Sequence, residues 1–315
     1  MKVSNWVRGS SSSFMLHREY TMSKLIHQSA SSSSTGGENK GHPLFMKVLE
    51  DHTYYKDNTM KQDLECQEPD FKGWKGNYKL DKTTWKPGEK VCYIIMEYLQ
   101  GHRMRGKKLD HGFNLQQIRQ IMVECAEGLQ HLQSLVPEKM PRTPSSCFVH
   151  RDFRMANLFW MGSKSREHDA ANGHIKILDY GLMVFANSQT ENNFNSAIHM
   201  PNACFDNYWL PEEACGVSRK GNFKSPYTAL DIFSYGVLLM ELMHPNRVQT
   251  FKKNTDSEDR RKKFMNEIYT RIRNRDGYLL KTHGVMAKAL GLGEKIFKRL
   301  TDSDPAKRPD ISYLV

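Results

Sequence analysis

The sequence of 315 residues lacks a long apolar run anywhere along its length. No segment approaches the ~18 consecutive apolar residues that a membrane-spanning helix needs. The opening residues, MKVSNWVRGSSSS, also lack the apolar stretch of roughly 7–15 residues found in secretory signals. Hydrophobic residues make up only 38% of the chain, a content typical of a folded body that carries long hydrophilic loops. We therefore expect a cytoplasmic protein, or the intracellular portion of a larger one.

Cysteine is scarce, and no two cysteines are spaced as a CxxC pair. The six are scattered along the chain at Cys66, Cys92, Cys125, Cys147, Cys204 and Cys215. Such spacing disfavours both a disulfide framework and a structural zinc site, because each needs closely grouped cysteines. Reduced thiols in a cytosolic or nuclear setting are the interpretation that fits.

Acidic residues are fewer than basic ones, at 35 against 46, so the net charge is +11. An excess of this kind can indicate a nucleic-acid partner or an acidic substrate. The basic residues gather between Arg247 and Lys281, where acidic residues and helical spacing are mixed among them. A solvated helical face explains this mixture better than a binding patch does. A basic nucleic-acid-binding module is thus a minor alternative, and no nucleic-acid partner is expected.

Two short polar segments next to apolar runs carry the clearest chemical signal. Residues 149–159 read VHRDFRMANLF and place Asp152 five residues before Asn157. Residues 175–182 read IKILDYGL and place Asp179 directly after a strand-like apolar run. Transfer of a phosphoryl group from Mg-ATP uses one carboxylate to accept a hydroxyl proton, and an amide and a second carboxylate to hold magnesium. The two segments supply those groups.

These segments resemble the catalytic loop and the metal-binding loop of eukaryotic-type protein kinases. The resemblance implies that Asp152 orients and deprotonates the acceptor hydroxyl, and that Asn157 and Asp179 coordinate Mg²⁺. It also implies that Arg151 meets a phosphate added to the activation segment. His150, Tyr180 and Gly181 are structural in this reading, and Tyr180 replaces the usual Phe, so its hydroxyl needs a partner.

The rest of the C-terminal two thirds resembles the large lobe of a kinase. Residues 115–135 show the apolar spacing of a long helix, and Asp231 opens the apolar helix YTALDIFSYGVLLMELM. In the family this aspartate braces the catalytic loop. Glu213 in YWLPEEAC and Arg308 in DSDPAKRPD match the family pair that fastens the activation segment to the large lobe.

The N-terminal third resembles a small lobe that has lost its first part. Residues 91–99 are similar to the last small-lobe strand and the hinge. Met96 would guard the nucleotide pocket, and the backbone from Glu97 to Leu99 would face adenine. Residues 14–27 place Glu19 on a helix, and Lys2 lies 17 residues earlier, close to the family spacing of the phosphate-binding lysine and its glutamate partner.

We therefore predict an α+β, bilobal protein-kinase-like fold with a truncated, β-rich small lobe and a mainly helical large lobe. The small lobe occupies residues 1–98, with inserts near 29–41 and 53–90, and the large lobe occupies residues 99–315. The glycine-rich loop that covers the phosphates in the family is absent from the sequence. Either the sequence is an incomplete piece of a working kinase, which we favour, or a true short chain has lost this loop.

The predicted function is transfer of the γ-phosphoryl group of ATP, with Mg²⁺, to a hydroxyl of a protein substrate. HRDFRMAN is closer to the HRDLRAAN of cytoplasmic tyrosine kinases than to the serine/threonine pattern, and Trp209 points the same way. Tyrosine is therefore slightly favoured as the acceptor. The alternatives are a pseudokinase that acts as a scaffold or allosteric module, and a small-molecule phosphotransferase. The latter class typically lacks DPxxRP, which is present here.

Overall fold

A computed structural model of the chain shows short sheets packed against helices. The structure describes residues 2–5, 11–31, 42–52, 91–104, 113, 115–135, 147–161, 173–186, 211, 227–243 and 296–315. None of the helices in those stretches combines the length and the apolar character needed to cross a membrane. The mixture of helices and small sheets agrees with the predicted α+β class.

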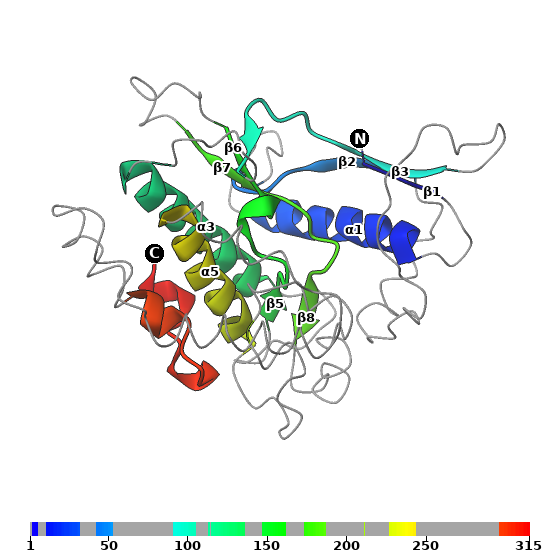
Figure 1. The fold of residues 1–315 in the computed structure, drawn as a ribbon. Helices are drawn as coiled ribbons and strands as arrows, with labels where there is room; N and C mark the ends of the chain where they lie inside the picture. The colour runs from blue at the N-terminus through cyan, green and yellow to red at the C-terminus, as the bar shows by residue number, and fades with distance from the viewer. Residues whose placement is uncertain are drawn as a thin grey trace, which may run out of the picture.

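A three-stranded antiparallel sheet forms the N-terminal part of the structure. Its strands are β1 (Lys2–Asn5), β3 (Val91–Met96) and β2 (Val48–His52), in the order β1-β3-β2. Helix α1 (Ser11–Ser31) runs beneath this sheet (Figure 1). Buried apolar side chains from the helix and from strands β2 and β3 meet in a small core of their own: Leu16, Val48 and Ile94.

Helix α1 matches the helix predicted from the spacing of its apolar residues. Glu19, Met22 and Ile26, predicted to share one face, are all buried. The helix is longer than predicted and continues to Ser31, so it takes in the first residues of the predicted insert near 29–41. Helical hydrogen bonding continues there because serine and alanine do not break a helix as proline does. The predicted insert at 53–90 lies outside the described residues.

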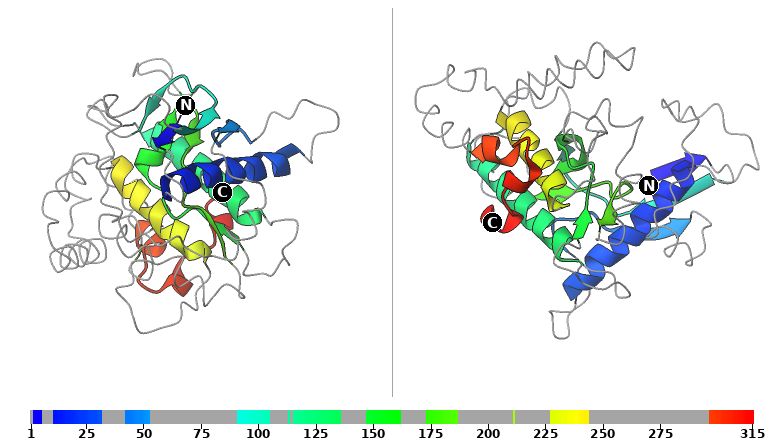
Figure 2. Two further views of the ribbon diagram at one scale, coloured as in Figure 1. Left: turned by 90° about the vertical axis from the view of Figure 1, so that its right-hand side faces the viewer. Right: turned by 90° about the horizontal axis from the view of Figure 1, so that it is seen from below.

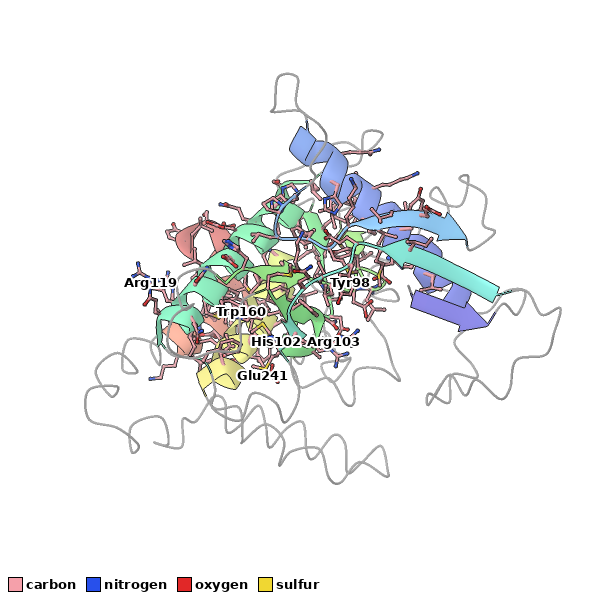
Figure 3. The ribbon with its side chains drawn as sticks, turned by 90° about the horizontal axis from the view of Figure 1, so that it is seen from above. Tyr98, His102, Arg103, Arg119, Trp160 and Glu241 are labelled. Carbon is pink, nitrogen blue, oxygen red and sulfur yellow. The ribbon has the colours of Figure 1, made fainter. Side chains whose placement is uncertain are left out.

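Two further small sheets surround the polar loops. Strands β4 (His102–Arg103), β6 (Leu158–Trp160) and β7 (Ile175–Ile177) pair antiparallel in that order. Figure 3 labels Trp160 of β6 and His102 and Arg103 of β4. Trp160 is the residue that pairs with His102. Strand β5 (Cys147–Val149) pairs with β8 (Val184–Ala186), so the residues before one polar loop lie beside those that follow the other.

Two helices form the base on which these sheets rest. Helix α3 (Leu115–Ser134) corresponds closely to the helix predicted at 115–135, and α5 (Thr228–Met243) corresponds to the predicted apolar helix. They lie side by side, as Figure 1 and the right-hand view of Figure 2 show. A carboxylate on α3 also holds strand β7, because Glu124 accepts a hydrogen bond of 2.7 Å from the backbone N–H of Ile175.

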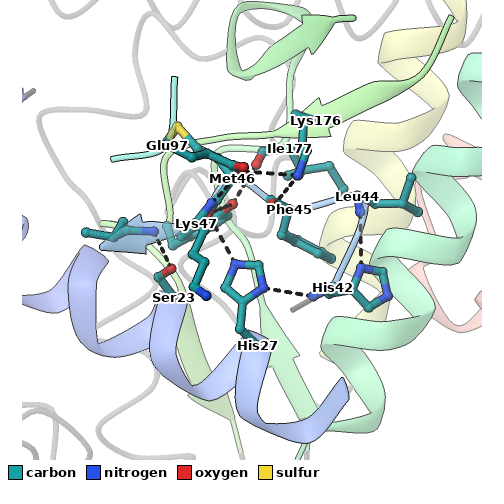
Figure 4. Close-up of polar contacts among 12 residues, drawn as sticks. Ser23, His27, His42, Leu44, Phe45, Met46, Lys47, Glu97, Lys176 and Ile177 are labelled. Carbon is teal, nitrogen blue, oxygen red and sulfur yellow. Dashed lines mark hydrogen bonds and ion pairs between the residues drawn. The ribbon is translucent and has the colours of Figure 1, made fainter. Parts of the chain in front are cut away.

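Residues 42–48 connect the N-terminal sheet to the rest of the molecule. Phe45 forms a parallel bridge with Ile177 of β7. The Met46 N–H donates to the Ile177 carbonyl at 3.1 Å, and the Ile177 N–H donates to the Leu44 carbonyl at 2.7 Å. Figure 4 shows this crossing, where polar side chains from α1 and β7 also converge. The segment therefore sets how α1 and its sheet sit relative to the polar loops.

Three histidines hold the end of α1 against this segment and against α3. The His42 N–H donates to His27 Nδ1 at 2.8 Å, while His131 Nε2 lies 3.1 Å from the Ile26 carbonyl. The rings of His42 and His131 stack with their centroids 3.9 Å apart. Burial lowers the pKa of all three side chains, that of His42 to about 4. His27 Nδ1 and His42 Nδ1 each accept a backbone N–H, so these two contacts require neutral imidazoles.

We predict that mild acid destabilises the protein through these histidines. An unfolded histidine has a pKa of about 6.5, so below that pH the unfolded state binds protons more readily than the folded state. Their contribution is complete above pH 6.5 and is lost as the pH falls toward 4. The free energy of unfolding, measured by urea titration, should be lower at pH 5 than at pH 7.5. His42→Asn should make this difference smaller by ~1–3 kcal/mol. Replacing the exposed His174 by Gln is the control, and an equal reduction there would contradict the prediction.

The close approach of α5 to residues 296–301 gives a second prediction. A Cβ added at Gly236 would lie 2.8 Å from Leu300 Cβ and 2.8 Å from Thr301 Cγ2. Leu300 Cβ is fixed to the backbone, and Thr301 Cγ2 can rotate away only by breaking the hydrogen bond of Thr301 Oγ1 to the Phe297 carbonyl. Gly236→Ala should therefore cost ~1–3 kcal/mol in the free energy of unfolding. In Gly128→Ala the new methyl meets the terminal methyl of Ile177, which can rotate, so the loss should be smaller. Urea titrations that rank the two variants in the opposite order would refute this account.

Candidate functional site

The first polar loop joins strand β5 to strand β6. Residues 150–154 follow the buried strand β5, and a 3₁₀ turn from Met155 to Asn157 leads into β6. The Asn157 amide closes the loop, since its Nδ2 donates to the Asp152 carbonyl at 2.9 Å and to the Asp152 carboxylate at 2.7 Å. The five-residue spacing seen in the sequence thus brings these two side chains into direct contact.

Asp152 is a buried carboxylate with an elevated pKa. Burial raises its pKa to about 6, and the nearby charge of Asp179 acts in the same direction. The guanidinium of Arg154, with Nε 3.0 Å from Asp152 Oδ1, and the hydrogen bond from Asn157 both act to lower it. A carboxylate with a pKa close to neutrality can accept a proton and release it again, as a general base must.

Asp179 stands at the start of the second polar loop in a left-handed backbone conformation, with φ of 64°. Strand β7 brings it to the first loop, because the Leu178 N–H donates to the Asn157 carbonyl at 2.8 Å. Asn157 Nδ2 is engaged by Asp152, so its side-chain oxygen is the atom that remains for a metal. One amide oxygen and the Asp179 carboxylate are oxygen donors of the kind that Mg²⁺ prefers. The two side chains therefore fit the magnesium site that the sequence predicts.

Helix α5 supports the first loop through Asp231. Its fully buried carboxylate accepts hydrogen bonds from the backbone N–H of His150 at 2.7 Å and from that of Arg151 at 3.1 Å. Burial raises the pKa of Asp231 to about 6, and the two N–H donors oppose this rise. Arg151 has a φ of 64°, a conformation that persists only where the surroundings hold it. The carboxylate supplies that restraint and thereby fixes the backbone just before Asp152.

The residues predicted to be structural in the two loops pack together. The ring of His150 lies edge-on to the ring of Tyr180, with centroids 6.3 Å apart, and burial lowers the pKa of His150 to about 4. Gly181 is buried in the turn that follows. Arg151 reaches across from the first loop, where its Nε donates to the Leu182 carbonyl at 2.5 Å. The loops therefore support each other through ring packing and one arginine.

The predicted small-lobe residues lie around the N-terminal sheet. The backbone of Lys2 pairs with Ile94 in the sheet, while its side chain is outside the described part of the structure. Glu19 is buried on α1, close enough for its charge to raise the pKa of Tyr180. The structure thus brings Glu19 to the second polar loop, and the predicted pairing of Lys2 with Glu19 stays a prediction.

The hinge residues follow strand β3. Met96 is the last residue of that strand and packs against the small core under the sheet. Leu99 is half-buried farther along. The Glu97 N–H donates to the Lys47 carbonyl at 2.9 Å, so the carbonyl of Glu97 is the group that this residue can offer to adenine. The Glu97 N–H, one of the backbone groups from Glu97 to Leu99 predicted to face the nucleotide, is therefore already bonded within the protein.

The side chain of Glu97 has a role that sequence reasoning missed. Its Oε1 accepts hydrogen bonds from the Lys47 N–H at 2.7 Å and from Lys176 Nζ at 3.1 Å (Figure 4). Lys176 also donates to the Phe45 carbonyl at 3.1 Å. The ion pair therefore ties the hinge to strand β7. The signal for this ion pair in the sequence was Lys176, a charged residue between two isoleucines of a strand.

Arg308 is buried near the C-terminal end of the described chain. Its guanidinium donates to the Ala229 carbonyl at 3.0 Å and to the Asp302 carbonyl at 2.9 Å, and it lies 5.1 Å from the centre of the Phe233 ring. These contacts attach residues 302–310 to the start of α5. Glu213 lies outside the described residues, so its predicted pairing with Arg308 stays a prediction.

Comparisons with known proteins agree with this geometry. The family model of the protein kinase domain matches residues 80–315. The chain is 27% identical over 177 residues to the probable serine/threonine-protein kinase mkcC of Dictyostelium discoideum, a match covering 56% of this chain and 15% of that protein. It is 27% identical over 167 residues to mitogen-activated protein kinase kinase kinase 7 of Drosophila melanogaster, which covers 52% of this chain and 20% of the relative.

A third relative is the serine/threonine-protein kinase ste20 of Emericella nidulans, 26% identical over 154 residues, which is 48% of this chain and 14% of that protein. The chain thus spans well under two thirds of the length of these relatives. The family match, by contrast, extends over most of the chain and includes both polar loops and α5. The chain belongs to the protein kinase domain family, a family of transferases.

Proposed function

We propose that the chain transfers the γ-phosphoryl group of ATP to a serine or threonine hydroxyl of a protein substrate. The observation that carries the proposal is the contact of Asp152 with Asn157, on a loop that Asp231 holds from behind, with Asp179 close enough to act on Asp152 by its charge. That grouping supplies a proton acceptor and oxygen donors for a metal within one small region. The family implies the bilobal arrangement in which such a region faces the nucleotide.

Each group has a separate role in the proposed reaction. Asp152 accepts the proton of the substrate hydroxyl as that oxygen bonds to the γ-phosphorus and ADP leaves. Asn157 keeps the Asp152 carboxylate oriented through its Nδ2, and its side-chain oxygen would be available to hold the metal. Asp179 would supply a carboxylate ligand. Mg²⁺, when bound by Asn157 and Asp179, would offset the negative charge on the phosphates.

Serine and threonine replace tyrosine as the proposed acceptors. The resemblance of HRDFRMAN to a tyrosine-kinase loop predicted the opposite, but two of the relatives described above are named serine/threonine kinases. A few residues around Asp152 are a small part of what binds a substrate, so they discriminate weakly. A cytoplasmic location and a role for Arg151 in binding a phosphorylated activation segment stay predictions. A scaffold without transferase activity is the main alternative.

Substitution of the proposed base tests the function directly. Asp152→Asn keeps the size of the side chain but removes its ability to accept a proton, so transfer of ³²P from Mg-ATP to mixed peptides should fall ~10²–10⁴-fold. Asp310→Asn, at an exposed turn cap, is the matched control and should retain activity. Phosphoamino-acid analysis of the product should show phosphoserine or phosphothreonine. Equal counts for wild type and Asp152→Asn would exclude the proposed role, and background counts for both would favour the scaffold.

The raised pKa of Asp152 predicts an acid limb in the activity profile. Below pH 6 the carboxyl group is protonated and cannot accept the hydroxyl proton, so kcat/KM should fall about tenfold per pH unit. Arg154 favours the charged carboxylate, so Arg154→Gln should raise the pKa and move the limb to higher pH. The nucleotide contributes the same pH dependence in both assays. The difference between the pH profiles of wild type and Arg154→Gln therefore reports on Asp152. Superimposable profiles between pH 5 and pH 8 would contradict the assignment.

A further inference from the structure

Glu97 lies where strand β3 would continue its pairing with strand β2. The antiparallel register pairs Val48 with Met96, so the next residues to face each other are Lys47 and Glu97. In an antiparallel ladder, every second pair of facing residues exchanges two hydrogen bonds, each N–H donating to the carbonyl opposite. The Glu97 N–H donates to the Lys47 carbonyl at 2.9 Å, which identifies this pair as one of the exchanging kind.

The second bond of this pair goes to the side chain of Glu97 instead of its backbone. The Lys47 N–H donates to Glu97 Oε1 at 2.7 Å (Figure 4). The carboxylate thus takes the place that the Glu97 carbonyl would have in a continued ladder. Within the part of the chain that the structure describes, the Glu97 carbonyl oxygen accepts no hydrogen bond. The ladder therefore ends with a carbonyl left over at the first residue of the hinge.

The carboxylate is held in this position from strand β7. Lys176 Nζ donates to the same oxygen, Glu97 Oε1, at 3.1 Å and to the Phe45 carbonyl at 3.1 Å. The side chain of Lys176 is only 17% exposed and that of Glu97 30%, so both charged groups are partly withdrawn from water. A charged acceptor also binds an N–H more strongly than a neutral carbonyl does. The carboxylate is therefore the preferred acceptor for the Lys47 N–H.

The hinge is fixed at its far end as well. The backbone of Gly101 lies against the Trp160 carbonyl so closely that no Cβ would fit there, and strand β4, which follows, pairs with β6. Between the two fixed ends, the side chain of Tyr98 is 87% exposed. Because both ends are fixed, the direction of the Glu97 carbonyl can change by a local rotation of its peptide group, without movement of the whole segment.

We propose that the Glu97 carboxylate is a positioning group that keeps the Glu97 carbonyl available to the 6-amino group of adenine. The proposal rests on the proposed function, in which ATP is the phosphoryl donor and the hinge faces its base. Without the carboxylate, the Lys47 N–H takes the carbonyl opposite and completes the ladder, because a partly buried N–H without an acceptor is costly. The carbonyl is then turned toward β2, and adenine loses one hydrogen bond.

Two variants of equal side-chain length separate this role from general support of the hinge. Glu97→Met keeps the length of the side chain but removes its oxygen atoms, so it cannot hold the Lys47 N–H. Glu97→Gln keeps an oxygen that accepts this N–H and should behave as wild type. Glu50→Ala removes an exposed carboxylate from β2 of the same sheet and is the control.

The measurement is calorimetric binding, with Mg²⁺ and without peptide, of ATP and of purine riboside triphosphate, in which hydrogen replaces the 6-amino group. Wild type, Glu97→Gln and Glu50→Ala should bind ATP about fivefold more tightly than the analogue, the ratio that one hydrogen bond supplies. Glu97→Met should bind the two nucleotides about equally, chiefly through weaker binding of ATP. Its unchanged binding of the analogue would show that the variant is folded.

A preference for ATP in Glu97→Met equal to that of wild type would overturn the proposal, and so would equal losses of affinity for both nucleotides. Absence of any preference in wild type would overturn it too. Failure of the proposed function gives a different result. Selective binding of ATP by wild type, lost in Glu97→Met, together with no transfer of phosphate to peptides, would refute the transferase activity and support the role of Glu97.

Discussion

The arrangement of the site depends on one buried carboxylate. Asp231 sits at the start of α5 with no exposure to solvent and receives two backbone N–H groups from the loop above it. Its position is set in turn by helix packing, because α5 lies against α3 and Arg308 binds the carbonyl of Ala229 in its first turn. The backbone that presents Asp152 is thereby built on the most regular part of the molecule, where positional precision is easiest to maintain.

The two polar loops are held by different parts of the protein. The loop of Asp152 depends on the helical base, whereas the loop of Asp179 receives its contacts largely from α1 and from the segment around Met46. The two supports meet at strand β7 and at the bond between Leu178 and Asn157. Alignment of the proton acceptor with the metal ligand therefore depends on the packing of both regions. A shift of α1 would act on the Asp179 loop directly and on the Asp152 loop through the contacts between the two loops.

Local features of the site could be predicted from the sequence, while pairings between distant residues could not. The spacing of Asp152 and Asn157 is short enough that a single turn brings them together. Periodicity located α1 and α3 because apolar faces repeat every three or four residues, and α5 was located by its apolar content and its resemblance to a kinase segment. The bonds of Lys176 to Glu97 and of Arg18 to Met183 join residues 79 and 165 positions apart, which no pattern in either segment encodes. The sequence predicted that the Tyr180 hydroxyl needs a hydrogen-bond partner. Only the structure identifies its partners as the carbonyls of Met46 and Ile177.

The crossing of residues 44–46 over β7 couples the N-terminal sheet to the strand that leads into Asp179. Those residues exchange backbone hydrogen bonds with Ile177, and the ion pair of Glu97 with Lys176 spans the same place. A displacement of the sheet that kept these bonds intact would be smallest at the crossing and would grow with distance along the strands.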